Sequence, residues 1–230
     1  MEWQKKFMKA VTFSYDDGVE QDIRLIEILN KYGLKCTFNL NSGLDYEHGT
    51  WRYDDKFDVH RLNLDEIKNI YKGHEIAVHG KKHLCLTDLD PDKLHTELSD
   101  DAAELYRIFG EKQVGMAYAY GAYNDYVVEK LGSLGIMYGR TVNSSYNFDV
   151  QRDLMRFQPT CHHDDDRLFD LAEKFLESDP DVPQIFYIWG HSYEFEGKNN
   201  WDRFERFCSM ISGKNDIFYG TNRQVLLNIN

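Results

Sequence analysis

Four acidic and histidine side chains form a pattern that is typical of a catalytic metal site. Asp16 and Asp17 are adjacent and precede Gly18, while His79 and His83 lie four residues apart. On a helical turn, a spacing of four residues places both imidazoles within reach of one ion. A carboxylate from Asp17 would complete a set of three ligands and leave one coordination position open for water. This pattern predicts a hydrolytic metal centre.

The two adjacent carboxylates need a neutralising partner, because neighbouring negative charges destabilise a fold. A metal bound to one of them would supply that partner and leave the other free as a base. An Asx turn at Asp17 and Gly18 accounts for one carboxylate but not for both. Zinc suits two histidines and one carboxylate, and iron, cobalt, nickel and manganese also accept this set.

Short apolar runs alternate with amphipathic segments along the chain. This alternation predicts parallel strands covered by helices, and seven or eight such units predict a closed or incomplete (β/α) barrel. The predicted strands are 10–15, 36–40, 75–79, 113–120, 136–138, 154–157 and 184–189, with 225–229 as a possible last one. The predicted helices are 23–32, 64–71, 91–109, 126–134, 168–175 and 204–211. We expect residues 1–230 to form a single catalytic domain.

Barrel active sites lie at the C-terminal ends of the strands. Four of the predicted strands end in residues that titrate or form turns: 16–18, 79–83, 120–123 and 190–193. We therefore expect these four segments to converge on one mouth. The last of them contributes a third histidine, His191.

Four segments also resemble the motifs of a known family, the polysaccharide deacetylases or NodB-type carbohydrate esterases. Residues 12–18 (Thr-Phe-Ser-Tyr-Asp-Asp-Gly) look like the first motif of that family, and residues 73–83 resemble the second. Residues 118–121 are similar to the third motif, and residues 185–191 are similar to the fifth. The order and spacing match over nearly the whole chain.

The resemblance implies a distorted barrel of parallel strands and a metal-dependent hydrolase that removes N- or O-linked acetyl groups from a sugar or sugar derivative. It implies that Asp16 is the general base and His191 the general acid. The backbone N–H of Tyr120 would help to hold the oxyanion. The implied metal ligands, with zinc as the expected ion, are Asp17, His79 and His83.

Some positions depart from the family pattern. Gly80 stands where Ser or Thr is usual, Ala117 stands where an Arg commonly steers the catalytic Asp, and Ala119 replaces a Pro. The fourth motif has no clear counterpart, and Arg140 or Asp149 could substitute for the missing groups. Two other functions stay open: hydrolysis of a cyclic amide, as in allantoinase-like relatives, and sugar binding without catalysis.

Composition narrows the class of partner. The formal net charge of −12 argues against nucleic acid and anionic membranes. Since neither a signal peptide nor an apolar run of membrane-spanning length is visible, we expect a cytoplasmic protein. Its cysteines read as free thiols. Aromatic residues make up 14% of the chain, which suits a carbohydrate partner as well as core packing.

Two further histidines, His162 and His163, precede the acidic run 164–166. A solvated loop is the favoured interpretation of this segment, and a second cation site or a substrate-binding loop are the alternatives. His74, just before a predicted strand, is expected to be structural.

Overall fold

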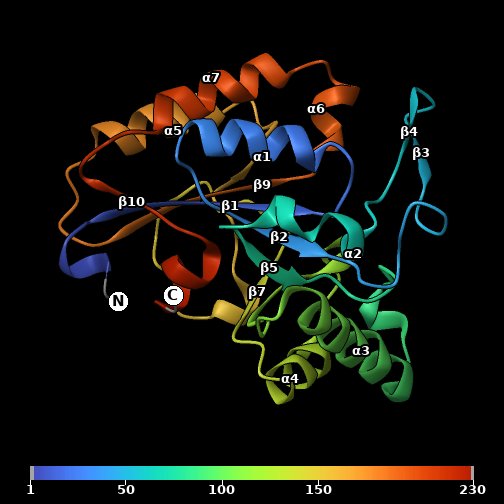
Figure 1. The fold of residues 1–230 in the computed structure, drawn as a ribbon. Helices are drawn as coiled ribbons and strands as arrows, with labels where there is room; N and C mark the ends of the chain where they lie inside the picture. Colours follow the sequence, from blue (N-terminus) through green and yellow to red (C-terminus); the bar gives the residue numbers. More distant parts are fainter. Residues whose placement is uncertain (1–2, 229–230) are drawn as a thin grey trace.

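The computed structural model describes residues 3–228, and its centre is a curved sheet of parallel strands (Figure 1). The strand order is β7-β6-β5-β2-β1-β9-β8, and β10 pairs with β1 beside this path. The strands are β1 Lys9–Asp16, β2 Cys36–Leu40, β5 Glu75–Val78, β6 Gly115–Ala117, β7 Tyr138–Arg140, β8 Cys161–His162, β9 Gln184–Gly190 and β10 Ile217–Tyr219. The prediction of an incomplete parallel barrel is confirmed.

Helices cover the outside of the curved sheet. In Figure 1, α1, α5 and α7 lie together above the sheet, and α3 and α4 lie below it near β5 and β7. The α-helices are α1 Asp22–Lys31, α2 Leu64–Ile67, α3 Pro91–Phe109, α4 Asp125–Ser133, α5 Leu168–Glu177, α6 Tyr193–Gly197 and α7 Trp201–Ile211. Short 3-10 helices are η1 Trp3–Lys5, η2 Lys68–Tyr71, η3 Leu86–Asp88, η4 Ala119–Gly121 and η5 Leu154–Arg156, and η6 Arg223–Leu227 is a π-helix.

The alternation of side chains along β1 sets the position of the first acidic pair. Val11, Phe13 and Tyr15 belong to the large hydrophobic core that the helices share. Because successive side chains of a strand point to opposite faces, Ser14 and Asp16 face the inside of the curved sheet. Both are buried. The interior of the half-barrel is therefore partly polar, and Asp16 stands at its C-terminal mouth.

Two predicted strands are wrong. Residues 154–156 form the 3-10 helix η5, and only Phe157 makes a bridge to Arg140 of β7. The predicted last strand overlaps the π-helix η6, and its final residue, 229, lies outside the described residues. The last strand of the chain is instead β10, which pairs in parallel with residues 9–11 of β1. Short apolar runs fit strands and buried turns equally well, so periodicity could not separate them.

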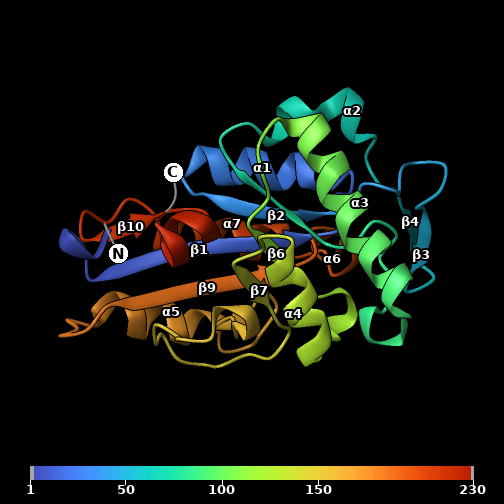
Figure 2. The same cartoon turned by 90° about the horizontal axis from the view of Figure 1, so that it is seen from below.

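The insertion between β2 and β5 carries an antiparallel hairpin, β3 Trp51–Tyr53 and β4 Phe57–Val59. It projects beside α6 in Figures 1 and 2. Edge-to-face contacts of Trp51 and Tyr53 with Tyr193 hold it there.

The four cysteines are free thiols, as expected. None of the described helices is long and apolar enough to span a membrane.

Candidate active site

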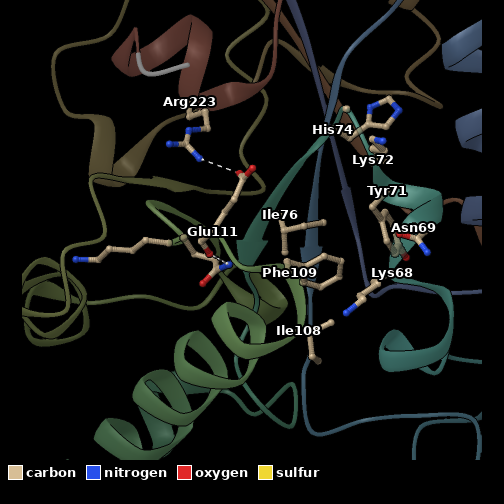
Figure 3. A pocket seen from close by; sticks show the side chains of 13 residues that line it. Lys68, Asn69, Tyr71, Lys72, His74, Ile76, Ile108, Phe109, Glu111 and Arg223 are labelled. Atoms are coloured by element: carbon tan, nitrogen blue, oxygen red, sulfur yellow. Dashed lines mark hydrogen bonds and ion pairs between the residues drawn. The ribbon is translucent and has the colours of Figure 1, made fainter.

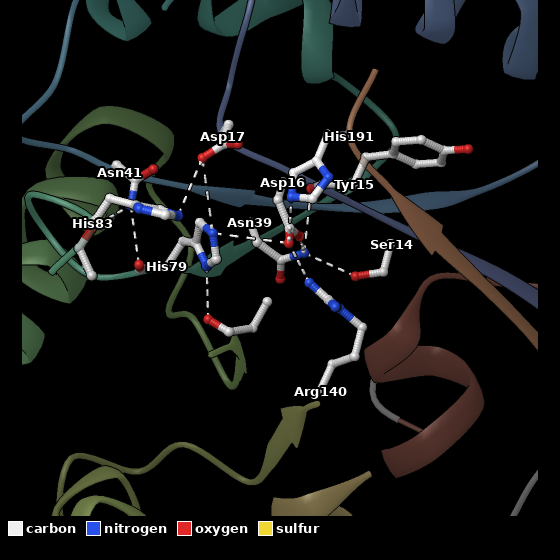
Figure 4. Close-up of polar contacts among 12 residues, drawn as sticks. Ser14, Tyr15, Asp16, Asp17, Asn39, Asn41, His79, His83, Arg140 and His191 are labelled. Carbon is white, nitrogen blue, oxygen red and sulfur yellow. Dashed lines mark hydrogen bonds and ion pairs between the residues drawn. The ribbon is translucent and has the colours of Figure 1, made fainter. Parts of the chain in front are cut away.

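Asp16 and Asp17 lie at the C-terminal end of β1 and are almost completely buried. Asp16 is the last residue of the strand, whereas Asp17 adopts a left-handed backbone with φ 86°. This change of conformation at the strand end aims the two adjacent carboxylates at different partners (Figure 4). The two carboxylates thus pair with different arginines, Asp16 with Arg140 and Asp17 with Arg61, while Nε2 of His79 lies 3.9 Å from both.

His79 and His83 meet across the loop that follows β5. The loop is an irregular turn and not the helical turn that the spacing suggested, with left-handed backbone at Gly80 and His83. The two ring centroids are nevertheless 4.8 Å apart. The Nε2 atoms of His79 and His83 lie 3.9 Å and 3.5 Å from Oδ1 of Asp17. The three predicted ligands therefore converge on one point.

The surroundings of His79 fit a metal ligand. Its Nδ1 lies 2.7 Å from the carbonyl oxygen of Ala117, so the ring proton sits on Nδ1 and donates to that oxygen. The lone pair of Nε2 then faces Asp17, and this buried atom has no hydrogen-bond partner in the described part of the chain. Burial lowers the pKa of His79, and it lowers the pKa of His83 to about 4. Both imidazoles are thus neutral and able to coordinate a cation.

Asp16 is held from two sides. Its Oδ1 accepts a hydrogen bond of 2.8 Å from Asn39, and its Oδ2 pairs with the guanidinium of Arg140. Burial raises the pKa of Asp16, but the neighbouring Arg140 outweighs this effect, and the net pKa lies below its usual range. Arg140 comes from β7 and stacks on Trp189 at 4.4 Å. Arg140 therefore provides the positive charge that an arginine at position 117 commonly provides in the family. Asp149, the other candidate substitute, is exposed and forms a β-bridge with Gln184 at the start of β9.

His191 lies at the end of β9, facing Asp16. Its Nε2 is 3.9 Å from Oδ2 of Asp16, and its Nδ1 is 3.5 Å from Oε2 of Glu194. Burial alone would lower the pKa of His191, but Glu194 and the two aspartates raise it to about 9. The imidazole therefore carries a proton at neutral pH and can donate it.

Tyr120 lies in the turn after β6, with a left-handed backbone at φ 59°. Its side chain is 71% exposed, and its ring contacts the ring of His83 edge to face, with centroids 4.7 Å apart. The residue thus stands at the same mouth as the three predicted ligands. This position keeps its backbone N–H as a candidate for the oxyanion role.

Sequence reasoning missed several groups that hold the site. The guanidinium of Arg61 donates to Oδ1 of Asp17 at 3.0 Å. Below the histidine loop, Asp101 accepts from the backbone N–H of His79, and Glu97 accepts from that of Lys82. Glu97 and Asp101 lie on the buried, otherwise apolar face of α3. The sequence did carry a signal for this contact, because Glu97 and Asp101 lie one helical turn apart within the apolar face of the predicted helix.

The segment around His163 is not a solvated loop, which corrects the favoured interpretation. His163 is fully buried, and its ring lies between those of Tyr15 and Phe195. Tight packing explains the burial, since a Cβ at Gly190 would come within 1.9 Å of the His163 ring. His74, by contrast, matches its structural expectation: its Nδ1 accepts a hydrogen bond from the backbone N–H of Cys36.

A cavity of about 280 Å³ lies at the opposite end of β5 (Figure 3). Its lining includes His74, just before β5, together with Lys68 and Lys72. Arg223 and Glu111 form an ion pair across it at 3.6 Å. Because catalytic groups in barrels gather where the strands end, we place the candidate active site at the other mouth, around Asp16 and His79.

Comparison with known proteins gives the family. Residues 4–139 match the model of the polysaccharide deacetylase family, and no curated protein matches the chain. The deacetylase PplD of Streptococcus pyogenes, solved with acetate, is 27% identical over 57% of this chain and 55% of its own, with a TM-score of 0.50. The alignment thus spans about half of that protein.

Two other structures share the fold over most of the chain. A Mycobacterium smegmatis protein described as a polysaccharide deacetylase is 17% identical, covers 100% of this chain and 92% of its own, and has a TM-score of 0.69. A family 4 carbohydrate esterase pseudoenzyme from Bacillus anthracis is 15% identical over 94% of this chain and 65% of its own, with a TM-score of 0.58. With the family model matching more than half of its length, the chain belongs to the polysaccharide deacetylase family.

Proposed function

We propose that this chain is an active, metal-dependent member of the family and removes acetyl groups from a carbohydrate. One observation carries the proposal: the ligand cluster of Asp17, His79 and His83 shares one mouth with a carboxylate and a protonated imidazole. The carboxylate of Asp16 and the Nε2 of His191 are 3.9 Å apart. A base and an acid at this spacing can serve the attacking water and the leaving group of one small acyl centre.

The metal is assigned to Asp17, His79 and His83, and zinc is the ion that we expect. A bound divalent cation supplies a Lewis acid that polarises the acyl oxygen and makes water more acidic. Asp17 is suited to hold a cation because its net pKa lies well below its usual range. Burial raises this pKa, but Arg61 and the nearby histidines outweigh the burial.

Asp16 takes the proton of the attacking water. Arg140 keeps this carboxylate ionised and fixes its orientation, and Asn39 holds the other oxygen. The backbone N–H of Tyr120 then donates to the developing oxyanion, a role that is worth about 3 kcal/mol for one such donor. His191 transfers its proton to the leaving amine or alcohol. Glu194 supports this step because it holds the protonated imidazole in place.

A carbohydrate substrate fits the aromatic rim of the site. Tyr193 lies close to His191, with ring centroids 5.2 Å apart, and it contacts Trp51 and Tyr53 of the projecting hairpin. These rings are partly exposed. On the other side of the mouth stands the exposed ring of Tyr120. Such rings stack on the apolar face of a sugar while its hydroxyls stay hydrated.

The test is release of acetate from N-acetylglucosamine oligomers and O-acetylated xylo-oligomers by metal-loaded protein. The matched variant is Asp17→Ala, which we expect to lose the metal of this cluster and the activity together. A control on cyclic amides such as allantoin tests the other hydrolase function. Acetate release that depends on metal and on Asp17 supports the proposal.

Two results would overturn it. Hydrolysis of the cyclic amide without acetate release would assign the chain to the other hydrolase class. Glycan binding that is equal with and without metal, and without turnover, would make the chain a binding domain.

A further inference from the structure

A second group of donor atoms lies at the end of β8, away from the three assigned ligands. We call it the His163 cluster. One donor atom of each of its residues lies within 4.8 Å of those of the others. The cluster joins the segment after β8 to the start of α6 and comprises His162, His163, Asp164 and Glu194.

The environment of His163 suits a metal ligand. Its side chain is fully buried, and neither ring nitrogen makes a hydrogen bond within the described part of the chain. Its Nε2 lies 3.4 Å from Oδ2 of Asp164 and 3.4 Å from Oε2 of Glu194, beyond a good hydrogen bond. A buried polar group that lacks a partner has a cost in stability. A cation between these atoms would remove that cost.

The spacing of the donors fits a small tetrahedral ion. Zinc with ligands at about 2.0–2.2 Å implies donor–donor edges of about 3.3–3.6 Å. Two edges of the His163 cluster measure 3.4 Å, from His163 to Asp164 and to Glu194. A third, between Nε2 of His162 and Oε2 of Glu194, measures 3.0 Å. Small adjustments would complete the tetrahedron.

The charge of the cluster also favours a cation. The carboxylates of Asp164 and Glu194 are only 10% and 15% exposed, and together they bring two negative charges next to one buried imidazole. Lys198 balances one of these charges, because its Nζ lies 2.6 Å from Oδ2 of Asp164. Glu194 also faces the imidazole of His191 at 3.5 Å, so an incoming ion would share this carboxylate with His191.

We propose that the His163 cluster is a second binding site for a zinc-like divalent cation, one that fills at higher metal concentration than the Asp17 cluster. Two contacts explain the weaker affinity. Lys198 occupies the oxygen of Asp164 that the ion needs. Nδ1 of His162 accepts the backbone N–H of Asp164 at 3.2 Å, so its proton sits on Nε2 and has to leave when the ion binds.

The second site is coupled to the active site through one atom. Oε2 of Glu194 faces His162 and His163, and it also lies 3.5 Å from Nδ1 of His191. An ion bound to Oε2 of Glu194 would weaken the attraction between this carboxylate and the imidazole of His191. If the proposed function holds, excess zinc therefore inhibits acetate release after the first equivalent has activated it.

The experiment is a zinc titration of metal-free protein, monitored with a chromophoric chelator as competitor and by metal analysis after desalting. We expect one tight and one weaker equivalent. Asp164→Asn, which alters a partly exposed residue, should weaken the second equivalent by about tenfold or more and leave the first unchanged. Asp17→Ala should lose the first and keep the second. The control is His48→Ala, which removes an exposed histidine that pairs with Asp45 at 2.8 Å.

Lys198→Met separates a metal site from a purely structural network. Removal of the competing ammonium should tighten the second equivalent, whereas the matched variant Lys56→Met should leave it unchanged. Lys56 is also exposed and donates to the carbonyl of Gly197 in the same region. The proposal would be overturned if the wild-type protein bound only one equivalent of zinc. It would also be overturned if the affinity for the second equivalent were unchanged in Asp164→Asn and Lys198→Met. Both readouts are independent of acetate release, so they stand even if the protein is not a deacetylase.

Discussion

The Asp17 cluster and the His163 cluster contain the same kinds of donor but differ in access. The first has three protein ligands at the mouth of the half-barrel, where His83 remains 19% exposed next to the exposed ring of Tyr120. The second has four donors around a histidine that is fully buried between two aromatic rings. Catalytic metal sites keep a position open, whereas closed four-ligand sites do not. This contrast agrees with the roles proposed above, chemistry at the first cluster and regulation of it at the second.

Basic side chains pair with carboxylates at both clusters, but these side chains differ in how deeply they are buried. Arg61 is buried against Asp17, and Arg140 is buried against Asp16. Lys198, on Asp164, is 46% exposed. We expect the buried guanidinium groups to stay on their carboxylates, whereas the more exposed ammonium of Lys198 can be displaced by a metal ion. Four substitutions test this difference, from the largest expected effect to the smallest.

Asp16→Asn tests whether the base and the ligand are distinct. We expect acetate release to fall by about 10²–10⁴-fold because the amide cannot accept the proton from water. The metal of the Asp17 cluster should remain, since Asp16 is not among its ligands. Kinetics and metal analysis of the same preparation provide the check. Full activity in Asp16→Asn, or loss of its metal, would contradict the division of roles.

Arg140→Met tests the buried cation. It leaves the carboxylate of Asp16 without its partner, so we expect a loss of about 3–5 kcal/mol in the free energy of unfolding. Denaturant titration measures the change. Arg52→Met, which removes an exposed pair with Asp58, should cost about 1 kcal/mol or less. The double variant Arg140→Met/Asp16→Asn should recover much of the loss, and a purely additive result would rule out the pairing.

Glu194→Gln tests the residue that the two regions share. Without this carboxylate the imidazole of His191 loses its orienting partner, and we expect kcat to fall by about 10–100-fold. The tight zinc equivalent should stay, and the weaker one should go. Glu196→Gln on the same helix is the control, because the Oε2 atom of Glu196 accepts a hydrogen bond of 2.9 Å from Gln21. Equal effects of the two variants would argue against a specific role for Glu194.

Asp22→Asn tests a buried carboxyl that links the regions. Asp22 begins α1 just after the acidic pair and accepts a hydrogen bond of 2.6 Å from Ser192, next to His191. Burial raises its pKa to about 7. Between the unfolded pKa near 3.8 and this value, the folded state holds a proton that the unfolded state has released. The stability of the wild type should therefore fall as pH rises through this window.

In Asp22→Asn this fall should disappear. We expect the variant to melt a few degrees above the wild type at about pH 8 and close to it at about pH 4, where the wild-type carboxyl is protonated in the fold. Thermal unfolding at several pH values supplies the measurement. Identical pH profiles for the two proteins would show that folding does not shift the pKa of Asp22.

The sequence was informative wherever a signal was local. The turn after the first strand, the spacing of His79 and His83 and the alternation of strands with helices were enough to predict the barrel and the three ligands. The order of the motifs pointed to the family, and the family model confirms it. The roles of Asp16, Tyr120 and His191, and metal binding by Asp17, His79 and His83, stay predictions that experiment can test.

Only the tertiary structure decided which distant residues complete the site. Arg140 reaches Asp16 from the opposite edge region of the sheet, 124 positions along the chain, and Glu97 and Asp101 support the histidine loop from a helix. The burial of His163 depends on Gly190, a neighbour on another strand. Periodicity reports which face of an element is buried, but not which charges meet there. Those pairings are set by strand order and close packing, which one sequence does not encode locally.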